Sequence, residues 1–449
     1  MANLLMNLQK KGKINLKTLW DLKVVSKEMR KVQKIDSNNN FYMAFYDDRF
    51  KINRVVVAFI DRLEKEKNTL NALFPMVLIR GNNKYKDMKE INRVLDNMYG
   101  ASLSIDVDKK GDLQTITFSI SFLNDRFAGE QLYEKALQFL HDIIYGPIEY
   151  GGGFEEEVIE QEKNNLKQEI EGRINDKVQY AIDRCIEIMF EGQNYALYEK
   201  GNVDDLKNIT KEKLFLQYKE VIEKKTIYVM IYGDYNEEYA ISKALEVFGQ
   251  NEREDIKNDF SINLPFTGTR YVTEEMEVNQ GKISIGIRTN VDTRSTDYYT
   301  LLMLNGVLGA SPKSKLFENV REKASLCYYA FSKVDRFKSV MVISSGIEIE
   351  NYEKALNLIL QQVDDIKKGN ITDIEYESAL NYYKTALMAV YDNPRDLVGF
   401  YLNQALVGEM LEPKEVFERL KNVRVSDIKE IANRFELDTV YFLRNRGAM

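Results

Sequence analysis

Two segments about half a chain length apart share one pattern, and this repeat restricts the possible folds more than any other feature of the 449-residue sequence. Residues 206–233 read LKNITKEKLFLQYKEVIEKKTIYVMIYG, and residues 420–445 read LKNVRVSDIKEIANRFELDTVYFLRN. Each segment begins with LKN, continues through an amphipathic helix and ends in an apolar strand. Solenoid repeats recur every 20 to 50 residues or so, so this longer spacing predicts the duplication of a whole domain.

The predicted strands and helices indicate an α+β fold with antiparallel-rich sheets. Ile116, Phe118, Ile120 and Phe122 alternate with Thr and Ser, which predicts a strand with one buried face. From 154 to 190, apolar residues recur at spacings of three and four, which predicts a long helical stretch with one buried stripe. The segment 372–375, TDIE, is a capping box and predicts the start of a second long helix. Hairpins and paired helices of this kind favour helices packed on sheets rather than strict βαβ alternation.

These patterns predict four segments along the chain. Residues 1–38 are Lys-rich and predict an N-terminal extension, and residues 39–250 are expected to form the first domain. Residues 251–269 are mostly polar and contain Pro265 and Gly268, which is typical of a linker. Residues 270–449 are then expected to form a second domain of similar topology.

Composition argues against several classes of protein. The 63 basic and 70 acidic residues are intermixed and give a net charge of −7, which does not indicate a nucleic-acid-binding protein. The sequence has no apolar run of about 18 residues and no signal-peptide pattern, so we expect no membrane span. Cys185 and Cys327 are far apart and do not suggest a disulfide framework. A cytoplasmic location is therefore expected.

The single histidine bears directly on metal binding. His141 lies among apolar residues in ALQFLHDIIYGP, which predicts an ordinary helix residue with a local hydrogen bond. Catalytic zinc sites normally use three protein ligands, and histidine is the commonest of them. One histidine and two distant cysteines therefore argue against a zinc site of the ordinary kind.

A motif in the second half resembles the M16 metallopeptidase family, also called insulinase or pitrilysin-like. After LNGVLG, residues 314–329 read SKLFENVREKASLCYY, similar to the family pattern S-x-L-F-x-x-x-R-E-x-x-x-L-x-Y. The matching residues are Ser314, Leu316, Phe317, Arg321, Glu322, Leu326 and Tyr328. In the first half, Gly81 and residues 88–120 resemble the family's helix, edge strand and hairpin. The resemblance covers roughly residues 40–449 and implies two similar domains of the LuxS/M16 peptidase-like fold. It also suggests a bacterial branch that lacks the zinc motif and accompanies an active homologue.

The resemblance locates a degenerate zinc site. In the family, H-x-x-E-H lies on a helix, and a glycine follows five residues after the second histidine; counting back from Gly81 places Ala72, Pro75 and Met76 at the three positions. The family's third ligand is a later glutamate, which Glu169 would match, with Glu162 seven residues before it. Alternatively, Glu162 and Glu169 form a solvated or ion-paired helix face. Either way we expect no bound metal, no cofactor and no catalytic residue in this chain alone.

The resemblance also implies a role for Arg321 and Tyr328. In active M16 enzymes, an arginine and a tyrosine of the second domain reach across a cavity and hold the substrate's carbonyl groups. A guanidinium provides a rigid fork of donors, which suits this task. The alternative is a surface ion pair between Arg321 and Glu318 or Glu322, together with a core tyrosine at Tyr328.

The sequence thus leaves three hypotheses for function. The first is a catalytically silent subunit that completes the chamber of a heteromeric zinc peptidase, with zinc on an H-x-x-E-H-containing M16 partner. Its substrate would be an extended peptide added to a sheet edge, for which residues 101–108, ASLSIDVD, are the candidate. The second is a non-proteolytic scaffold or peptide-binding protein of M16 fold. The third is a self-sufficient peptidase with an unusual site.

Overall fold

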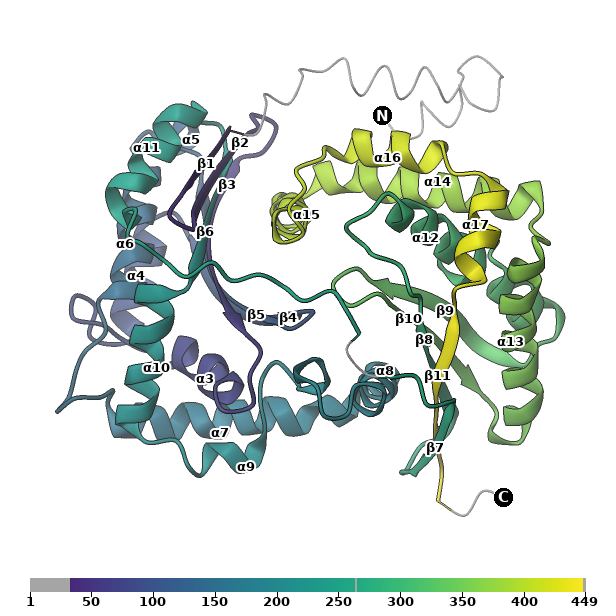
Figure 1. Ribbon diagram of the computed structural model, residues 1–449. Helices are drawn as coiled ribbons and strands as arrows, with labels where there is room; N and C mark the ends of the chain where they lie inside the picture. Colours follow the sequence, from purple (N-terminus) through teal and green to yellow (C-terminus); the bar gives the residue numbers. More distant parts are fainter. Residues whose placement is uncertain (1–32, 263–264, 447–449) are drawn as a thin grey trace.

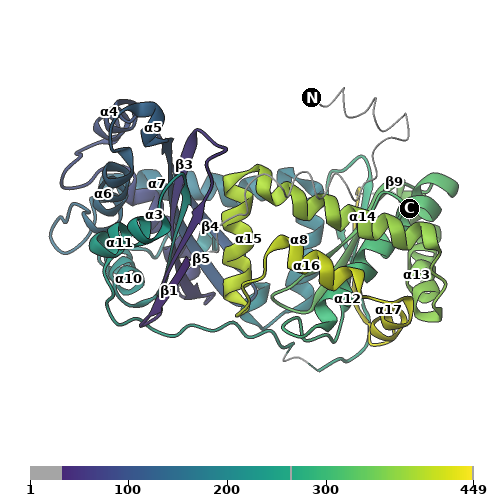
Figure 2. The same cartoon turned by 90° about the horizontal axis from the view of Figure 1, so that it is seen from above.

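The computed structural model describes residues 33–262 and 265–446, which form two α+β halves (Figure 1). The first half contains a six-stranded sheet and the second a five-stranded sheet. Both sheets are mainly antiparallel, and most helices lie on their outer faces (Figures 1 and 2). The predicted α+β class is confirmed. No helix in the described ranges is long and apolar enough to cross a membrane.

The first sheet has the strand order β1–β2–β6–β3–β5–β4. Its strands are β1 (Gln33–Ser37), β2 (Asn40–Tyr46), β3 (Ile52–Arg62), β4 (Ser102–Lys110), β5 (Leu113–Leu123) and β6 (Thr226–Gly233). The accompanying helices are α3 (Asn68–Leu78), α4 (Met88–Asn97), α5 (Asp125–Ala128), α6 (Leu132–Tyr145), α7 (Glu156–Gly172), η1 (Arg173–Asn175), α8 (Lys177–Met189), η2 (Asn194–Ala196), α9 (Val203–Leu206), α10 (Lys211–Lys224) and α11 (Glu237–Phe248). The predicted apolar face of β5 is fully buried in the first core, as its alternation requires.

The second sheet has the strand order β7–β11–β8–β10–β9. Its strands are β7 (Arg270–Glu275), β8 (Gly281–Arg288), β9 (Cys327–Asp335), β10 (Val340–Ile347) and β11 (Glu436–Arg444). The helical segments are α12 (Asp297–Asn305), η3 (Gly306–Ala310), η4 (Leu316–Lys323), η5 (Ile349–Asn351), α13 (Tyr352–Lys368), α14 (Asp373–Ala389), η6 (Val390–Asp392), α15 (Pro394–Leu406), α16 (Pro413–Lys421) and α17 (Val425–Ala432). The predicted capping box at Thr372 and Glu375 begins α14.

The two sheets have equivalent strand topologies. Strands β2, β6, β3, β5 and β4 of the first sheet occur in the same order as β7, β11, β8, β10 and β9 of the second. Strand β2 pairs in parallel with β6, and β7 pairs in parallel with β11. The other pairs of these two sets are antiparallel. The LKN segments supply α10 and β6 in one half and α17 and β11 in the other. The duplication predicted from these segments is confirmed.

The chain segments at the predicted boundaries can be placed only in part. Residues 33–37 of the predicted extension form β1, which pairs with β2, and residues 1–32 lie outside the described residues. Residues 251–262 and 265–269 of the predicted linker contain no helix or strand.

Each half sends one helix onto the sheet of the other half. Helix α8 packs on β8 and β11, and α15 packs on β3 and β6 (Figures 1 and 2). The approach of α8 is so close that a Cβ at Gly286 would lie 2.8 Å from Met189 Sδ. In the reciprocal contact, Tyr401 of α15 is fully buried and its ring centroid lies 4.8 Å from that of Phe45. The two halves are therefore interlocked.

This exchange corrects the prediction of one buried stripe from 154 to 190. The stretch forms α7 and α8, separated by η1, because Asp176 caps a new helix by accepting hydrogen bonds from the backbone of Val178 and Gln179. Leu166 of α7 belongs to the core of the first half. Met189 of α8 instead packs in a cluster with β10 of the second half.

A buried ion pair joins the two halves where their hairpin turns meet. Lys338, in the turn between β9 and β10, is fully buried and forms an ion pair with Asp112, in the turn between β4 and β5. Its ammonium also donates to the Asp259 carbonyl at 3.2 Å. A buried charge needs such partners, so this lysine ties the hairpins together.

Candidate functional site

Helix α3 places apolar side chains at the three positions of the degenerate zinc site. Ala72 and Pro75 are buried, and Met76 is partly buried against the first core. These side chains therefore serve as apolar packing in the first half. Alanine and proline side chains cannot bind a metal or transfer a proton, and a thioether is a soft, weak ligand.

A buried polar network that the sequence analysis missed anchors α3 beside these positions. Asn71 donates to Gln114 Oε1 at 2.9 Å and to Asp61 Oδ2 at 3.1 Å, and it accepts from Gln217 at 2.8 Å. Lys225 Nζ lies 3.4 Å from Asp61 Oδ1 and balances its charge. The sequence contained one sign of this network, which is that Asn71 stands beside an apolar run. A buried amide requires hydrogen-bond partners, so polar neighbours were to be expected.

The two glutamates of α7 are both engaged in ion pairs. Glu162 is buried, and its Oε1 lies 2.5 Å from Arg80 Nε. Glu169 is half exposed, and its Oε2 lies 2.8 Å from Lys200 Nζ. The geometry supports the ion-paired alternative for this pair of residues.

Arg321 lies in a segment of unusual helical form. Both η3 and η4 are π-helical, and π-helical turns occur frequently at functional sites. Gly309 of η3 lies so close to β9 that a Cβ at this position would be only 2.4 Å from Ser332 N. A residue with a side chain would clash with the strand there. The Arg321 guanidinium lies 4.8 Å from the Phe317 ring centroid, and its Nε lies 3.6 Å from Glu322 Oε1. The surface ion pair with Glu322 that was the alternative for Arg321 is therefore present, although it is long.

Tyr328 is the extra residue of a β-bulge at the start of β9. Cys327 pairs with Ile347 and Tyr329 with Gly346, so Tyr328 has no opposite partner on β10. Bulges often re-aim a side chain next to an active site. Tyr328 is 51% exposed, so the alternative of a core tyrosine is wrong. Its hydroxyl donates to the carboxylate of Glu348, a partner that the sequence analysis did not find.

The structure brings Arg321 and Tyr328 onto neighbouring elements. Segment η4 packs against β9. Burial raises the pKa of the Cys327 thiol, and the positive charge of Arg321 offsets part of this rise. Arg321 therefore lies near the start of β9. The hydrogen bond to Glu348 raises the pKa of Tyr328, so its hydroxyl stays protonated and able to donate.

The single histidine lies elsewhere in the first half. His141 is in α6, as predicted, and its ring stacks on Tyr145 with a centroid distance of 4.7 Å. Burial lowers its pKa. Its Nδ1 has no hydrogen-bond partner among the described residues, so the predicted local hydrogen bond is not made at that atom. In the same described part of the chain, no three His, Cys, Asp or Glu side chains gather closely enough to hold a metal.

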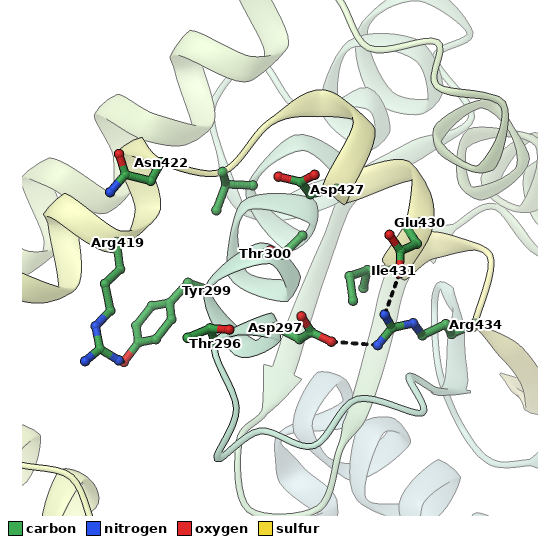
Figure 3. Close-up of a pocket in the computed structure, with 11 residues that line it drawn as sticks. Thr296, Asp297, Tyr299, Thr300, Arg419, Asn422, Asp427, Glu430, Ile431 and Arg434 are labelled. Carbon is green, nitrogen blue, oxygen red and sulfur yellow. Dashed lines mark hydrogen bonds and ion pairs between the residues drawn. The ribbon is translucent and has the colours of Figure 1, made fainter.

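A cavity of about 540 Å³ lies on the outer side of the second half, between α12, α16 and α17 (Figure 3). At one side of the cavity, Arg434 pairs with Asp297 at 2.7 Å and with Glu430 at 2.8 Å (Figure 3). Arg434 thus engages two of the carboxylates that line the cavity. None of the predicted site residues lines it.

Sequence and structure comparisons identify relatives that match this arrangement. Residues 208–383 match the family described as Peptidase M16 inactive domain. The chain is 32% identical over 401 residues to a Bacillus subtilis (strain 168) protein named "Probable inactive metalloprotease YmfF", with 88% of this chain and 94% of that protein covered. The chain belongs to the M16 peptidase family.

Two further similar proteins extend the comparison. The beta subunit of the mitochondrial-processing peptidase of Saccharomyces cerevisiae is 24% identical over 320 residues, with 67% of each chain covered. The crystal structure of a conserved protein from Enterococcus faecalis V583 has a TM-score of 0.84 and 28% identity, and it covers 93% of this chain and 99% of its own.

The M16 family implies a zinc ion on the helix that corresponds to α3, and the residues present do not fit one. Ala72 and Pro75 offer no ligand atom, and the Glu169 carboxylate is paired with Lys200. This chain is therefore an M16 peptidase homologue whose helix α3 lacks zinc-binding side chains.

Proposed function

We propose that this chain is a cytoplasmic, catalytically silent subunit of a heteromeric zinc peptidase, in which it completes the peptide-binding chamber. One contrast carries the proposal: α3 presents Ala72, Pro75 and Met76, whereas Arg321 and Tyr328 remain exposed on a π-helical segment and a β-bulge. Such irregular elements carry a cost in backbone hydrogen bonding and are frequent at functional sites. Their presence supports a role in substrate contact.

The division of chemistry follows from this contrast. A partner with H-x-x-E-H would hold zinc and activate the attacking water. Arg321 would present its planar fork of donors to a substrate carbonyl, and Tyr328 would donate to the oxyanion that develops in the transition state. The yeast relative is by name a subunit of a processing peptidase, which supports an assembly.

The peptide itself would add to β4. This strand is the last in its sheet, so one side of its backbone is open in the described part of the chain. An open edge can accept an extended peptide through main-chain hydrogen bonds, which read conformation more than sequence. The segment 101–108, predicted as the edge, includes most of this strand.

A non-proteolytic scaffold of M16 fold is the second candidate. It is favoured by the observation that Arg321 and Tyr328 already have carboxylate partners, Glu322 and Glu348, within the chain. Under this alternative the chain would still bind a partner or a peptide, but the assembly would not cleave.

Co-purification with an H-x-x-E-H homologue from the same organism tests the proposal. We expect the isolated chain to hold no stoichiometric zinc after dialysis and to cleave no peptide, because α3 carries no ligand at its three positions. The complex should contain one zinc per pair and should cleave. A stable complex without cleavage would favour the scaffold. One tightly bound zinc per isolated chain, with cleavage that a chelator abolishes, would contradict the proposal.

A further inference from the structure

The cavity between α12, α16 and α17 has a nearly buried hydroxyl group in its wall (Figure 3). Thr300 of α12 lines the cavity and is only 8% exposed, and its hydroxyl makes no hydrogen bond with any described residue. Its oxygen is not one of the atoms that are sealed from solvent without a partner, so it opens on the cavity. Burying such a group unpaired is unfavourable, so a partner has to come from solvent or from a ligand.

Two further polar side chains of the lining are available for hydrogen bonds. Thr296 lies about one helical turn before Thr300, at the start of α12, and its hydroxyl does not cap the helix. Asn422 ends α16, which forms another wall of the cavity. Within the described ranges, neither side chain makes a hydrogen bond. Hydroxyl and carboxamide groups both donate and accept, so these walls can match either kind of ligand group.

The cavity has the size and the mixed lining of a site for a small molecule. Its volume of about 540 Å³ lies within the range of roughly 300–1,000 Å³ that is common for ligand pockets. Val423 and Ile431 are buried and give it an apolar surface beside the polar groups. An apolar lining with a few polar groups that fix orientation is typical of such pockets.

The charged side chains that line the cavity all have oppositely charged partners. The pairs are Asp297–Arg434, Glu430–Arg434, Asp427–Arg424 and Arg419–Glu409. A charged ligand would therefore have to displace a partner, whereas a neutral ligand would not. Arg434 approaches Oδ2 of Asp297 and Oε1 of Glu430, so the second oxygen of each carboxylate can still accept a hydrogen bond.

We propose that this cavity binds a neutral molecule rich in hydroxyl groups, namely a monosaccharide. Sugar hydroxyls both donate and accept, so they match Thr296, Thr300 and Asn422 as well as the remaining carboxylate oxygens. The C–H surface of the sugar ring packs against Val423 and Ile431. A neutral sugar also leaves the ion pairs of the lining intact. The site does not depend on the proposed function, because none of the residues that line it takes part in that function.

Calorimetric titration of the purified full-length chain tests the site. The neutral probes are glucose, galactose and mannose, and the charged probes are the 2-amino sugar and the 6-phosphate of each. At least one neutral sugar is expected to bind with a dissociation constant of about 1 mM or lower. Its two charged analogues should bind about tenfold more weakly or not at all, because neither finds an unpaired opposite charge in the cavity.

Two variants and one matched control locate the binding. Thr300→Val keeps the shape of the side chain and removes its hydroxyl, so it should weaken binding about tenfold, roughly one hydrogen bond. Asn422→Ala should have a similar effect, and Asn422 is exposed, so this variant is informative even if Thr300→Val does not fold. Thr385→Val makes the same change on α14, where the hydroxyl donates to the Asn381 carbonyl, and should bind like the wild type. Thermal unfolding shows whether each variant is folded.

Three results would overturn the inference. The first is that none of the three neutral sugars binds with a dissociation constant of about 1 mM or lower. The second is binding that persists unchanged in both Thr300→Val and Asn422→Ala, because the sugar would then lie elsewhere. The third is a charged analogue that binds as tightly as the neutral sugar. All three leave the proposed function untouched, since peptide cleavage by the pair is not measured.

Discussion

Arg321→Ala is expected to lower peptide turnover by the reconstituted pair about 100-fold, and Tyr328→Phe by a similar factor, because under the proposed function each removes a donor to substrate oxygen. Folding and pairing should be nearly unaffected. The guanidinium is exposed and its ion pair with Glu322 is long, and surface pairs of this kind contribute little to stability. Turnover is measured at matched concentrations of complex, with the amount of complex checked by size-exclusion chromatography.

Glu348→Gln is the control for these variants. It removes the carboxylate that accepts from Tyr328 but leaves the tyrosine in place, so the pair should keep most of its activity. Full activity of both Arg321→Ala and Tyr328→Phe would mean that these residues are structural, and the scaffold would then be favoured. Loss of the complex in the Arg321 variant would instead show that the arginine supports the fold.

Lys338→Met is expected to destabilise the protein by about 3 kcal/mol, because breaking a buried ion pair leaves an uncompensated charge. Lys338 is 1% exposed, and it forms an ion pair with Asp112 across the junction of the halves. The change would also leave the Asp259 carbonyl without this donor. The free energy of unfolding is measured by denaturant titration, with one cooperative transition expected because α8 and α15 interlock the halves.

The double variant Lys338→Met with Asp112→Asn separates charge from packing. It removes both charges, so it should be less destabilised than Lys338→Met alone. A change of less than about 0.5 kcal/mol for Lys338→Met, which is typical of a surface substitution, would show that the pair does not hold the hairpins together.

The duplicated fold could be predicted from the sequence, because α10–β6 and α17–β11 carry the LKN pattern and the alternation along β5 fixes its buried face. The exchange of α8 and α15 could not. A stripe of apolar residues shows that a helix face is buried but not which sheet buries it. The apolar positions of 154–190 are divided between the first core and the second sheet, and only the Asp176 cap marks the division.

The candidate site could likewise be predicted only in part from the sequence. The absence of ligands at Ala72, Pro75 and Met76 follows from residue type alone, so the sequence sufficed. The bulge at Tyr328 and its hydrogen bond to Glu348 depend on strand register, which the sequence leaves open.

Titration of this chain into a fixed amount of an H-x-x-E-H partner, with peptide cleavage as the readout, tests the central claim most directly. Under the proposed function, the partner supplies zinc and this chain supplies the second wall of the chamber with Arg321 and Tyr328. The rate of cleavage should therefore rise from near zero and level off when this chain and the partner are present in equal numbers. Cleavage by the partner alone that does not change as this chain is added, or cleavage by this chain without the partner, would contradict the account.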